Sequence, residues 1–334
     1  MRLAPHLLFL IPELLIAAGP FVIQAAGRGR FRMAEFFYGG QALIEGVMMR
    51  GRTTVAMSVR PRDGAIRTYS EPLPAALSNG RWIRVPFVRG IFVLYETLVI
   101  GTRMLMRSAA LAAEGEDVQL GKGAIALTLV LSLGFAVSLF FLLPLFLSTF
   151  ADHATRSDLL SNAIEGLIRL AIFVGYLALI GMAADIRRVF AYHGAEHKAI
   201  SAHEAREPLT PEAVDRFSTA HTRCGTTFIL IVVVISIFFF SLVPRAGVPL
   251  PLLFASRIVL IPLIAAVAYE LVRFGARHYG NKLVRAIYAP GLWLQSLTTR
   301  PPDRSMLQVS IASLESCIAS DEVAAGQPMV ASGP

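Results

Sequence analysis

Histidine is concentrated in one polar stretch of this chain. Four of the seven histidines lie within residues 185–225, namely His193, His197, His203 and His221. A neutral imidazole nitrogen is a good ligand for zinc and for other first-row divalent metals. The concentration of histidine therefore indicates a candidate metal site.

The centre of this stretch reads YHGAEHK over residues 192–198. On a helix, His193 and His197 project from one face a single turn apart, so both imidazoles can reach the same ion. Glu196 lies beside them, where it can act as a base on a metal-activated water or as a ligand. The spacing H-x-x-E-H is the inverted zinc-peptidase pattern. We therefore expect zinc, or another divalent metal, with Glu196 as the catalytic base.

Further residues are candidates for completing the site. His221 and Cys224 stand directly before an apolar segment, and an imidazole with a thiolate would complete a tetrahedral zinc site. Glu270 stands at the edge of a later apolar segment, where a charged group is costly unless it is paired or hydrated. Arg223 or Arg50 could stabilise an anionic intermediate or bind a phosphate.

Each assignment has a simpler alternative, which the sequence leaves open. A five-residue pattern with three fixed positions, such as H-x-x-E-H, can arise by chance. Histidines at an interface can also be merely solvated or hydrogen-bonded. Cys224 could be an ordinary buried thiol. Glu270 could pair with Arg273, which is its i+3 neighbour on a helix.

The composition predicts that these residues belong to an integral membrane protein. Hydrophobic residues make up 55% of the chain, charged residues only 16%, and the mean hydropathy is +0.60. Soluble domains carry about a quarter charged residues. The net charge of +8 is explained by topogenic charge and attraction to anionic lipid. No nucleic-acid recognition motif is present, and the spacing of Cys224 and Cys317 does not indicate a disulfide framework.

Four segments have the length and apolar character of transmembrane helices, at about 124–148, 163–184, 226–243 and 253–273. Basic residues gather between the second and third segments and after the fourth. The positive-inside rule therefore places the N-terminal part, residues 185–225 and the C-terminus in the cytoplasm. This topology brings His193, His197, His221, Cys224 and Glu270 to one membrane surface.

The fold class expected is an α-helical polytopic membrane protein with a small cytoplasmic β-rich module, about four transmembrane helices and an interfacial amphipathic helix. Within the module, 42–49 and 53–59 read as strands and 65–69 as a returning strand. A short amphipathic helix is expected near 305–318. The expected organisation is a leader or extra hydrophobic segment over 1–32, the module over 33–90, the interfacial helix over 91–122, a membrane core over 123–275 and a cytoplasmic segment over 276–334.

A glycine-rich string, GGQALIEGVMMRG, opens the β-rich module at residues 39–51. Glycines around a strand indicate turns and close backbone approach. Glu45 and Arg50 could reach the metal region or a substrate, or pair with each other within a hairpin. Met48 and Met49 are expected to be packing residues.

Four strings taken together carry a resemblance to a known family: GGQALIEGVMMRG, YHGAEHK, HTRCGT and, over 289–303, APGLWLQSLTTRPPD. They resemble the YqhQ-like family of bacterial membrane proteins over about residues 33–315. The family usually has proline where this chain has Thr222. The resemblance implies a bacterial inner-membrane location and a domain of unknown function, described as a predicted metal-dependent enzyme. It also implies that Met33 is the usual start.

The leading functional hypothesis is a metal-dependent hydrolase at the cytoplasmic membrane surface. Its main alternative is a membrane-protein biogenesis or assembly factor with a structural zinc site, whose basic face would dock a ribosome, a translocon or a client protein. A transporter is less favoured, because we expect almost no ionisable residues in the spans at mid-membrane, where transport sites usually lie. A homo-oligomer is compatible with the sequence.

Overall fold

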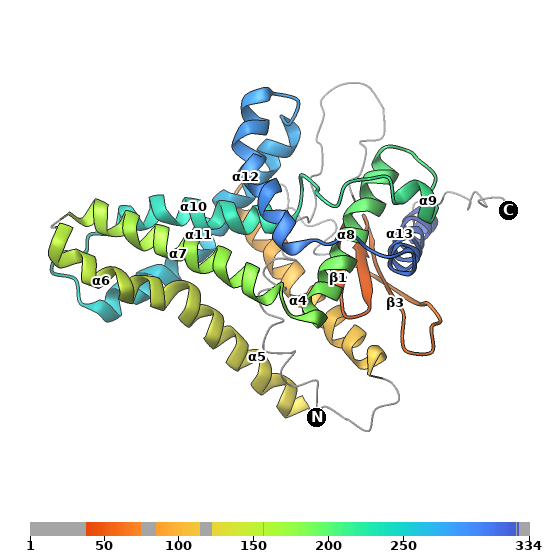
Figure 1. Cartoon of the computed structure of the whole chain (residues 1–334), viewed down its shortest axis with the longest axis horizontal. Coiled ribbons are helices and arrows are strands. Elements are labelled where there is room, and N and C mark those ends of the chain that lie inside the picture. The colour runs from red at the N-terminus through yellow and green to blue at the C-terminus, as the bar shows by residue number, and fades with distance from the viewer. Residues whose placement is uncertain (1–37, 75–84, 114–121, 156, 325, 327–334) are drawn as a thin grey trace.

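The computed structural model describes residues 38–74, 85–113, 122–155, 157–324 and 326. Over these residues the protein is mostly helical, with one four-stranded antiparallel sheet near the N-terminal end. In Figure 1 the long apolar helices α6, α7 and α10 lie on one side of the molecule, and the sheet lies on the other with α8 and α13. The predicted leader over 1–32 is outside the described residues.

The sheet is a meander in which β1 Gly39–Leu43, β2 Gly46–Arg50, β3 Thr54–Val59 and β4 Arg67–Pro72 pair in chain order. The strand expected over 53–59 is confirmed as β3. The single strand expected over 42–49 is wrong, because the chain turns at Ile44 and Glu45 to form the β1–β2 hairpin. Glu45, the second residue of this turn, has a φ of 55°, a left-handed value that is uncommon for residues other than glycine.

Both faces of the two central strands are covered. Met48 and Met57 pack on one face against the long helices α4 Val88–Ala112 and α11 Leu250–Arg277. Val47 and Met49, which point the opposite way, pack against α8 Ala184–Glu204 and α13 Arg304–Ala324. The packing role expected of Met48 and Met49 is therefore confirmed. The sheet is held between two helical layers.

The pairing of Glu45 with Arg50 inside the hairpin is wrong. The Glu45 carboxylate instead accepts hydrogen bonds from Arg188 on α8, and from the Tyr192 hydroxyl at 3.3 Å. Arg50 is buried and donates to the carbonyl of Gly51 at 3.2 Å. The turn between β1 and β2 is thus attached to α8.

Helix α4 coincides with the amphipathic helix that the sequence predicts. Its Val93, Ile100 and Met104 are buried in the core shared with the sheet and α11, while Ile91 and Tyr95 are exposed. One apolar face of α4 therefore packs in the protein core, and other apolar side chains of the same helix are exposed. A location in the membrane interface stays a prediction.

Among the residues that the structure describes, three helical stretches are long and apolar enough to cross a membrane: 130–150, α7 Asp158–Ile180 and α11. The first is built from α5 Lys122–Val137, the π-helix η2 Ser138–Leu142 and α6 Leu143–Thr155. The third expected span, 226–243, coincides with α10 Gly225–Ser241, an apolar helix of only 17 residues. Their exposed leucine, valine and phenylalanine side chains suit a lipid environment.

The remaining helices connect the membrane part to the sheet. Three residues separate the end of α7 from the start of α8, and α9 Pro211–Val214 is a single turn. α12 Lys282–Thr298 is continuous although Pro290 lies inside it, and it packs so closely on α10 that a Cβ at Gly291 would lie 2.7 Å from the Thr227 side chain. α13 extends six residues beyond the helix expected near 305–318 and closes one face of the sheet.

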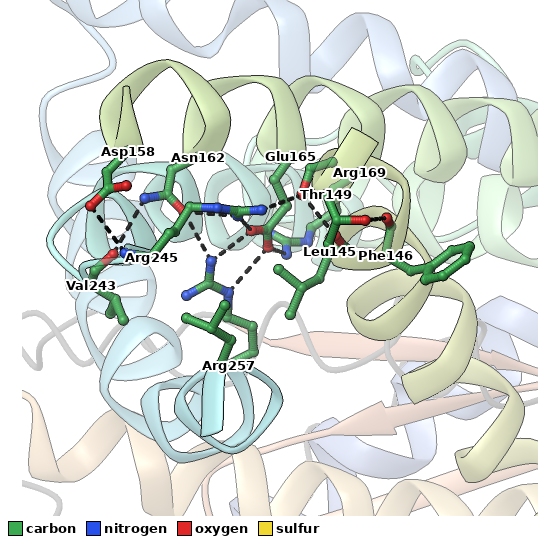
Figure 2. Close-up of polar contacts among 12 residues, drawn as sticks. Leu145, Phe146, Thr149, Asp158, Asn162, Glu165, Arg169, Val243, Arg245 and Arg257 are labelled. Carbon is green, nitrogen blue, oxygen red and sulfur yellow. Dashed lines mark hydrogen bonds and ion pairs between the residues drawn. The ribbon is translucent and has the colours of Figure 1, made fainter. Parts of the chain in front are cut away.

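One group of buried charges holds the membrane helices together, as Figure 2 shows. Arg245 and Arg257 donate to Glu165 Oε2 at 2.9 and 2.6 Å, and Arg169 donates to Glu165 Oε1. Asn162 accepts from Arg257 at 2.9 Å. The expectation of almost no ionisable residues inside the spans is therefore wrong, because apolar neighbours masked these residues in the hydropathy of α7 and α11.

Replacing Glu165 with glutamine should destabilise the protein strongly. The substitution leaves three guanidinium groups around a neutral side chain, and breaking a buried pair typically costs about 3–5 kcal/mol. We expect a much lower Tm for Glu165→Gln in lipid nanodiscs, measured by thermal unfolding.

Glu207→Gln is the matched control, because Glu207 is exposed outside the helices and should leave the Tm nearly unchanged. Equal Tm values for the two variants would show that the charge cluster does not hold the helices together.

Candidate metal centre

Helix α8 carries the histidine motif and is buried despite its polar sequence. Twelve of its 21 residues are buried, including Glu196, His197 and Lys198. Small residues permit this burial: a Cβ at Gly194 would lie 2.2 Å from the carbonyl oxygen of Arg300. Lys198 is satisfied by Asp215, whose carboxylate it reaches at 2.9 Å. Each buried polar group on this helix therefore needs a partner from elsewhere in the chain.

Three of the predicted ligands come together. The ligand atoms of His193, His197 and Cys224 all lie within 4.8 Å of one another, and all three residues are buried. The Cys224 sulfur lies 3.4 Å from His193 Nε2, and the two imidazole rings have centroids 4.4 Å apart. Bond lengths of about 2.0–2.3 Å in a tetrahedral zinc site put neighbouring ligands roughly 3.3–3.8 Å apart. A small contraction of this group would fit one zinc ion.

Two backbone carbonyls fix the orientation of the imidazoles. His193 donates its Nδ1 hydrogen to the carbonyl of Thr298 at 2.9 Å, and His197 donates its Nδ1 hydrogen to the carbonyl of Thr219 at 2.5 Å. Because a carbonyl only accepts, both rings carry their proton on Nδ1 and leave the Nε2 lone pair for a ligand. Such carbonyl contacts to the second nitrogen are typical of metal-binding histidines.

Cys224 is placed by the start of a helix. It is the N-cap of α10, and its sulfur accepts from the Thr226 backbone N–H at 3.4 Å. Burial raises the pKa of the Cys224 thiol to about 12, although the Thr226 hydroxyl and the N–H groups of Thr226 and Thr227 act in the opposite direction. The N–H groups of a helix N-terminus favour a thiolate, and a bound metal would displace the thiol proton.

His197 and its neighbour His221 are held neutral. Burial lowers the pKa of His197 well below its usual value, and the neighbouring His193 and His221 act in the same direction. Burial likewise lowers the pKa of His221 to about 4. A neutral imidazole is the form that binds a metal.

His221 lies beside the group and is not part of it. Its ring centroid is 5.6 Å from that of His197, but its Nδ1 accepts from the Arg223 backbone N–H and its Nε2 lies 3.5 Å from Glu204. Gln295 holds the His221 backbone at both its N–H and its carbonyl, each at 2.8 Å. The structure therefore places this predicted ligand next to the site.

Glu196 lies buried beside His197. Its Oε2 is 3.5 Å from His197 Nε2, and its carboxylate accepts from the Gly40 backbone N–H. Burial raises the pKa of Glu196 to about 7, although His193, Arg223 and the Gly40 N–H act in the opposite direction. A carboxyl group with a pKa near neutrality suits general acid–base chemistry.

Arg223 lies close to Glu196 and the metal group, whereas Glu270 is bound elsewhere. Arg223 forms an ion pair with Glu204. Burial lowers the pKa of Arg223 to about 10, although the nearby Glu196 carboxylate acts in the opposite direction. Glu270 is bound by Arg89, whose Nε donates to it at 2.6 Å, and by the Phe87 backbone N–H. Glu270 is thus engaged outside the metal group.

Sequence reasoning missed several residues that complete the site: Gly40, Glu204, Thr219, Gln295 and Thr298. Gly40, Gln295 and Thr298 lie within the strings that carry the family resemblance, which was a usable signal. A Cβ at Gly40 would lie 2.6 Å from Glu196 Cγ, so the glycine leaves room for this carboxylate. All four strings therefore meet at one place in the fold.

Comparison with known proteins gives two matches. The profile of a family described as Protein of unknown function (DUF1385) matches residues 85–320. The relative called "Uncharacterized protein YqhQ" from Bacillus subtilis (strain 168) is 34% identical over 289 residues, which cover 83% of this chain and 90% of the relative. No solved structure matches this chain.

The metal group makes a direct prediction about metal content. Purified wild-type protein, loaded with zinc and desalted, should retain about one zinc per chain by elemental analysis. The double variant His193→Ala/His197→Ala should retain almost none, because it keeps only one of the three ligands. Zinc should also raise the Tm of the wild type and not of the double variant.

His203→Ala is the matched control, since His203 is on the same helix but its ring packs on Tyr38, with centroids 5.1 Å apart. It should retain zinc like the wild type. If the double variant retained as much zinc per chain as the wild type, His193 and His197 would not be zinc ligands.

Replacing Gly40 with alanine should displace Glu196 and destabilise the sheet. The new methyl group would lie 2.6 Å from Glu196 Cγ and 2.9 Å from the Met48 carbonyl, and overpacking of this kind typically costs about 1–3 kcal/mol. We expect a lower Tm with zinc retained, since no ligand changes.

Gly134→Ala, in contrast, should not lower the Tm. Nothing lies within 4 Å of a Cβ there, and alanine inside a helix is favoured over glycine by about 1 kcal/mol. A Gly40→Ala protein as stable as Gly134→Ala would contradict the close packing at Glu196.

Proposed function

The chain belongs to the DUF1385 family of proteins of unknown function, as its resemblance to YqhQ-like proteins predicts, and within that family we propose that it is a metal-dependent hydrolase. Its metal would be zinc or another divalent ion, and its site would lie at the cytoplasmic surface of a bacterial inner membrane.

One observation supports this proposal most strongly. Three buried ligand atoms, from His193, His197 and Cys224, lie within 4.8 Å of one another, and the carboxylate of Glu196 is 3.5 Å from the Nε2 of His197. Catalytic zinc sites have three protein ligands and an open fourth position, whereas structural sites are closed by four. Among the described residues, this group has three ligands and a carboxylate beside them.

Each residue has a distinct role in the proposal. A bound zinc would supply a Lewis acid that polarises the substrate and acidifies a coordinated water. Glu196 would accept the proton of that water and return it to the leaving group. His193 and His197, fixed by carbonyls at Nδ1, would hold the ion, and Arg223 would stabilise negative charge on the substrate.

The location rests on charge distribution. The segment 185–225, which contains α8, holds six basic residues, whereas the α10–α11 connection holds only Arg245. The positive-inside rule then places the metal group at the cytoplasmic side. We propose that α10 crosses the membrane together with the three longer stretches, which gives four spans within the part of the chain that the structure describes.

Glu196→Gln tests the catalytic role directly. Glutamine fills nearly the same volume but cannot take up a proton, so zinc content should stay near one per chain while turnover falls by at least about a hundredfold. The measurement is hydrolysis of a panel of chromogenic esters, peptides and phosphodiesters by zinc-loaded protein in nanodiscs.

Glu207→Gln, at an exposed site, should leave both zinc content and turnover unchanged. If Glu196→Gln turned over substrate as fast as the wild type, Glu196 would not be the catalytic base. Retained zinc with no hydrolysis by wild-type protein would favour a structural metal site and an assembly role.

A further inference from the structure

Helix α12 carries an apolar face that is exposed over residues 282–293. Leu283, Ile287 and Trp293 on this face are 63–68% exposed. At about 100° per residue, these three side chains fall within a sector of about 120° on the helix surface, and the exposed Pro290 lies in the same sector. Exposed apolar faces of this kind mark contacts with a protein partner or with a membrane.

The rest of the exposed surface of α12 is polar and basic. Lys282, Arg285 and Ser296 are exposed, and their positions on the helix fall outside the apolar sector. Tyr288 and Gly291, on a third side of the helix, are buried against the protein. A helix with basic residues on its polar face, and with tryptophan and leucine on its apolar face, is typical of the membrane interface.

The contacts of α12 place it at one end of two apolar helices. Gly291 packs on Thr227, which is the third residue of α10. The Tyr288 hydroxyl donates to the carbonyl of Leu271 at 2.5 Å, and the same ring packs closely on Gly275. Leu271 and Gly275 belong to the last two turns of α11. Helix α12 therefore lies where α10 begins and α11 ends.

The direction of α12 suits a position in the plane of a membrane. In Figure 1 α12 runs crosswise to α7 and α10. Helix α7 is long and apolar enough to span a membrane, and α10 is the shorter apolar helix that we propose as a further span. A helix that crosses the ends of such spans at a steep angle lies roughly parallel to the bilayer surface.

The surroundings of the apolar face favour lipid over a protein partner. Helix α11 presents exposed apolar side chains to its last turn, where Phe274 is exposed, so the lipid-facing surface of this helix reaches the level of α12. The positive charges of Lys282 and Arg285 suit the negative surface of a phospholipid leaflet. Both the apolar and the basic part of α12 therefore match the chemistry of one bilayer surface.

We propose that α12 is an interfacial helix that binds the phospholipid leaflet at the N-terminal end of α10. Its Leu283, Ile287 and Trp293 side chains lie about 5–10 Å into the boundary between headgroups and acyl chains. Lys282 and Arg285 lie at the anionic headgroups. This proposal rests on the membrane spans and not on the metal group or on hydrolysis, so its tests need no enzymatic activity.

Spin labels on the two exposed faces of α12 test this proposal. A nitroxide is attached to Ile287→Cys in the apolar sector or to Arg285→Cys in the polar sector, in full-length protein in nanodiscs of phosphatidylcholine and phosphatidylglycerol. The native Cys224 and Cys317 are buried, and unsubstituted protein treated with the same reagent measures their background labelling. We expect oxygen, which concentrates in hydrocarbon, to relax the label at position 287 more than a water-soluble nickel complex does. The label at position 285 should show the reverse preference.

Two outcomes of this experiment would overturn the proposal. Preferential relaxation by the nickel complex at both positions would show that the apolar face lies in water. Exclusion of both oxygen and nickel from the label at Ile287→Cys would show that protein, not lipid, covers this face. Both native side chains are exposed, so neither substitution leaves a cavity in the core.

Trp293 provides a second measurement without a label. The chain has two tryptophans, so Trp82→Phe leaves Trp293 as the only one. Phospholipid brominated near the headgroup end of its acyl chains should lower Trp293 emission at least about twofold, and more than phospholipid brominated near the chain ends does. Unchanged emission in both lipids, or stronger quenching by the deeper bromines, would contradict an interfacial position.

Discussion

The burial of a polar helix is the constraint on which the candidate site depends. Helix α8 enters the space between the sheet, α13 and the residues after α12, where its imidazoles and carboxylate have little access to water. A buried polar group is costly unless it is paired, so the surrounding chain must supply a partner for each one. Thr219, Thr298 and Gly40 do so with backbone groups. Those contacts leave His193, His197 and Cys224 with ligand atoms facing one another, which is the arrangement that a metal ion requires.

Sequence reasoning predicted the parts of this site that depend on local geometry. His193 and His197 follow from helical periodicity, and Cys224 follows from its place before an apolar helix. Gln295 and Thr298 lie within a string that carries the family resemblance, but nothing in that string signals what they contact. Thr219 has no such signal. All three act through contacts between distant segments, and Thr219 and Thr298 orient the histidines only through their carbonyls. Glu270 has the right residue type and lies beside a candidate membrane span, yet it binds Arg89. The Ile44–Glu45 turn was also missed, since nothing in its residue types signals a hairpin.

The membrane part satisfies its polar groups in a different way. There the charges pair with one another, with Glu165 accepting from three arginines on or near three helices. Hydropathy averaged over a span does not reveal such a cluster, because a few charged residues are outweighed by their apolar neighbours. The fold and the span regions could therefore be predicted from the sequence, while the groups that hold the spans together could not. Helix α10 lies between the two polar sites, with Cys224 before its first residue and Ser236 near its other end.

The packing of α13 on the sheet has a consequence for how the protein is made. Strands β2 and β3 are synthesised early, but Cys317 and Ser313 of α13, which bond to their backbone, follow more than 250 residues later. The Thr298 carbonyl that orients His193 also comes from this late part of the chain. During translation the early strands therefore leave the ribosome without the helix that covers them, and they need temporary protection from aggregation. The metal group is completed only after the membrane helices have been inserted, so a chain interrupted before that stage carries no assembled site.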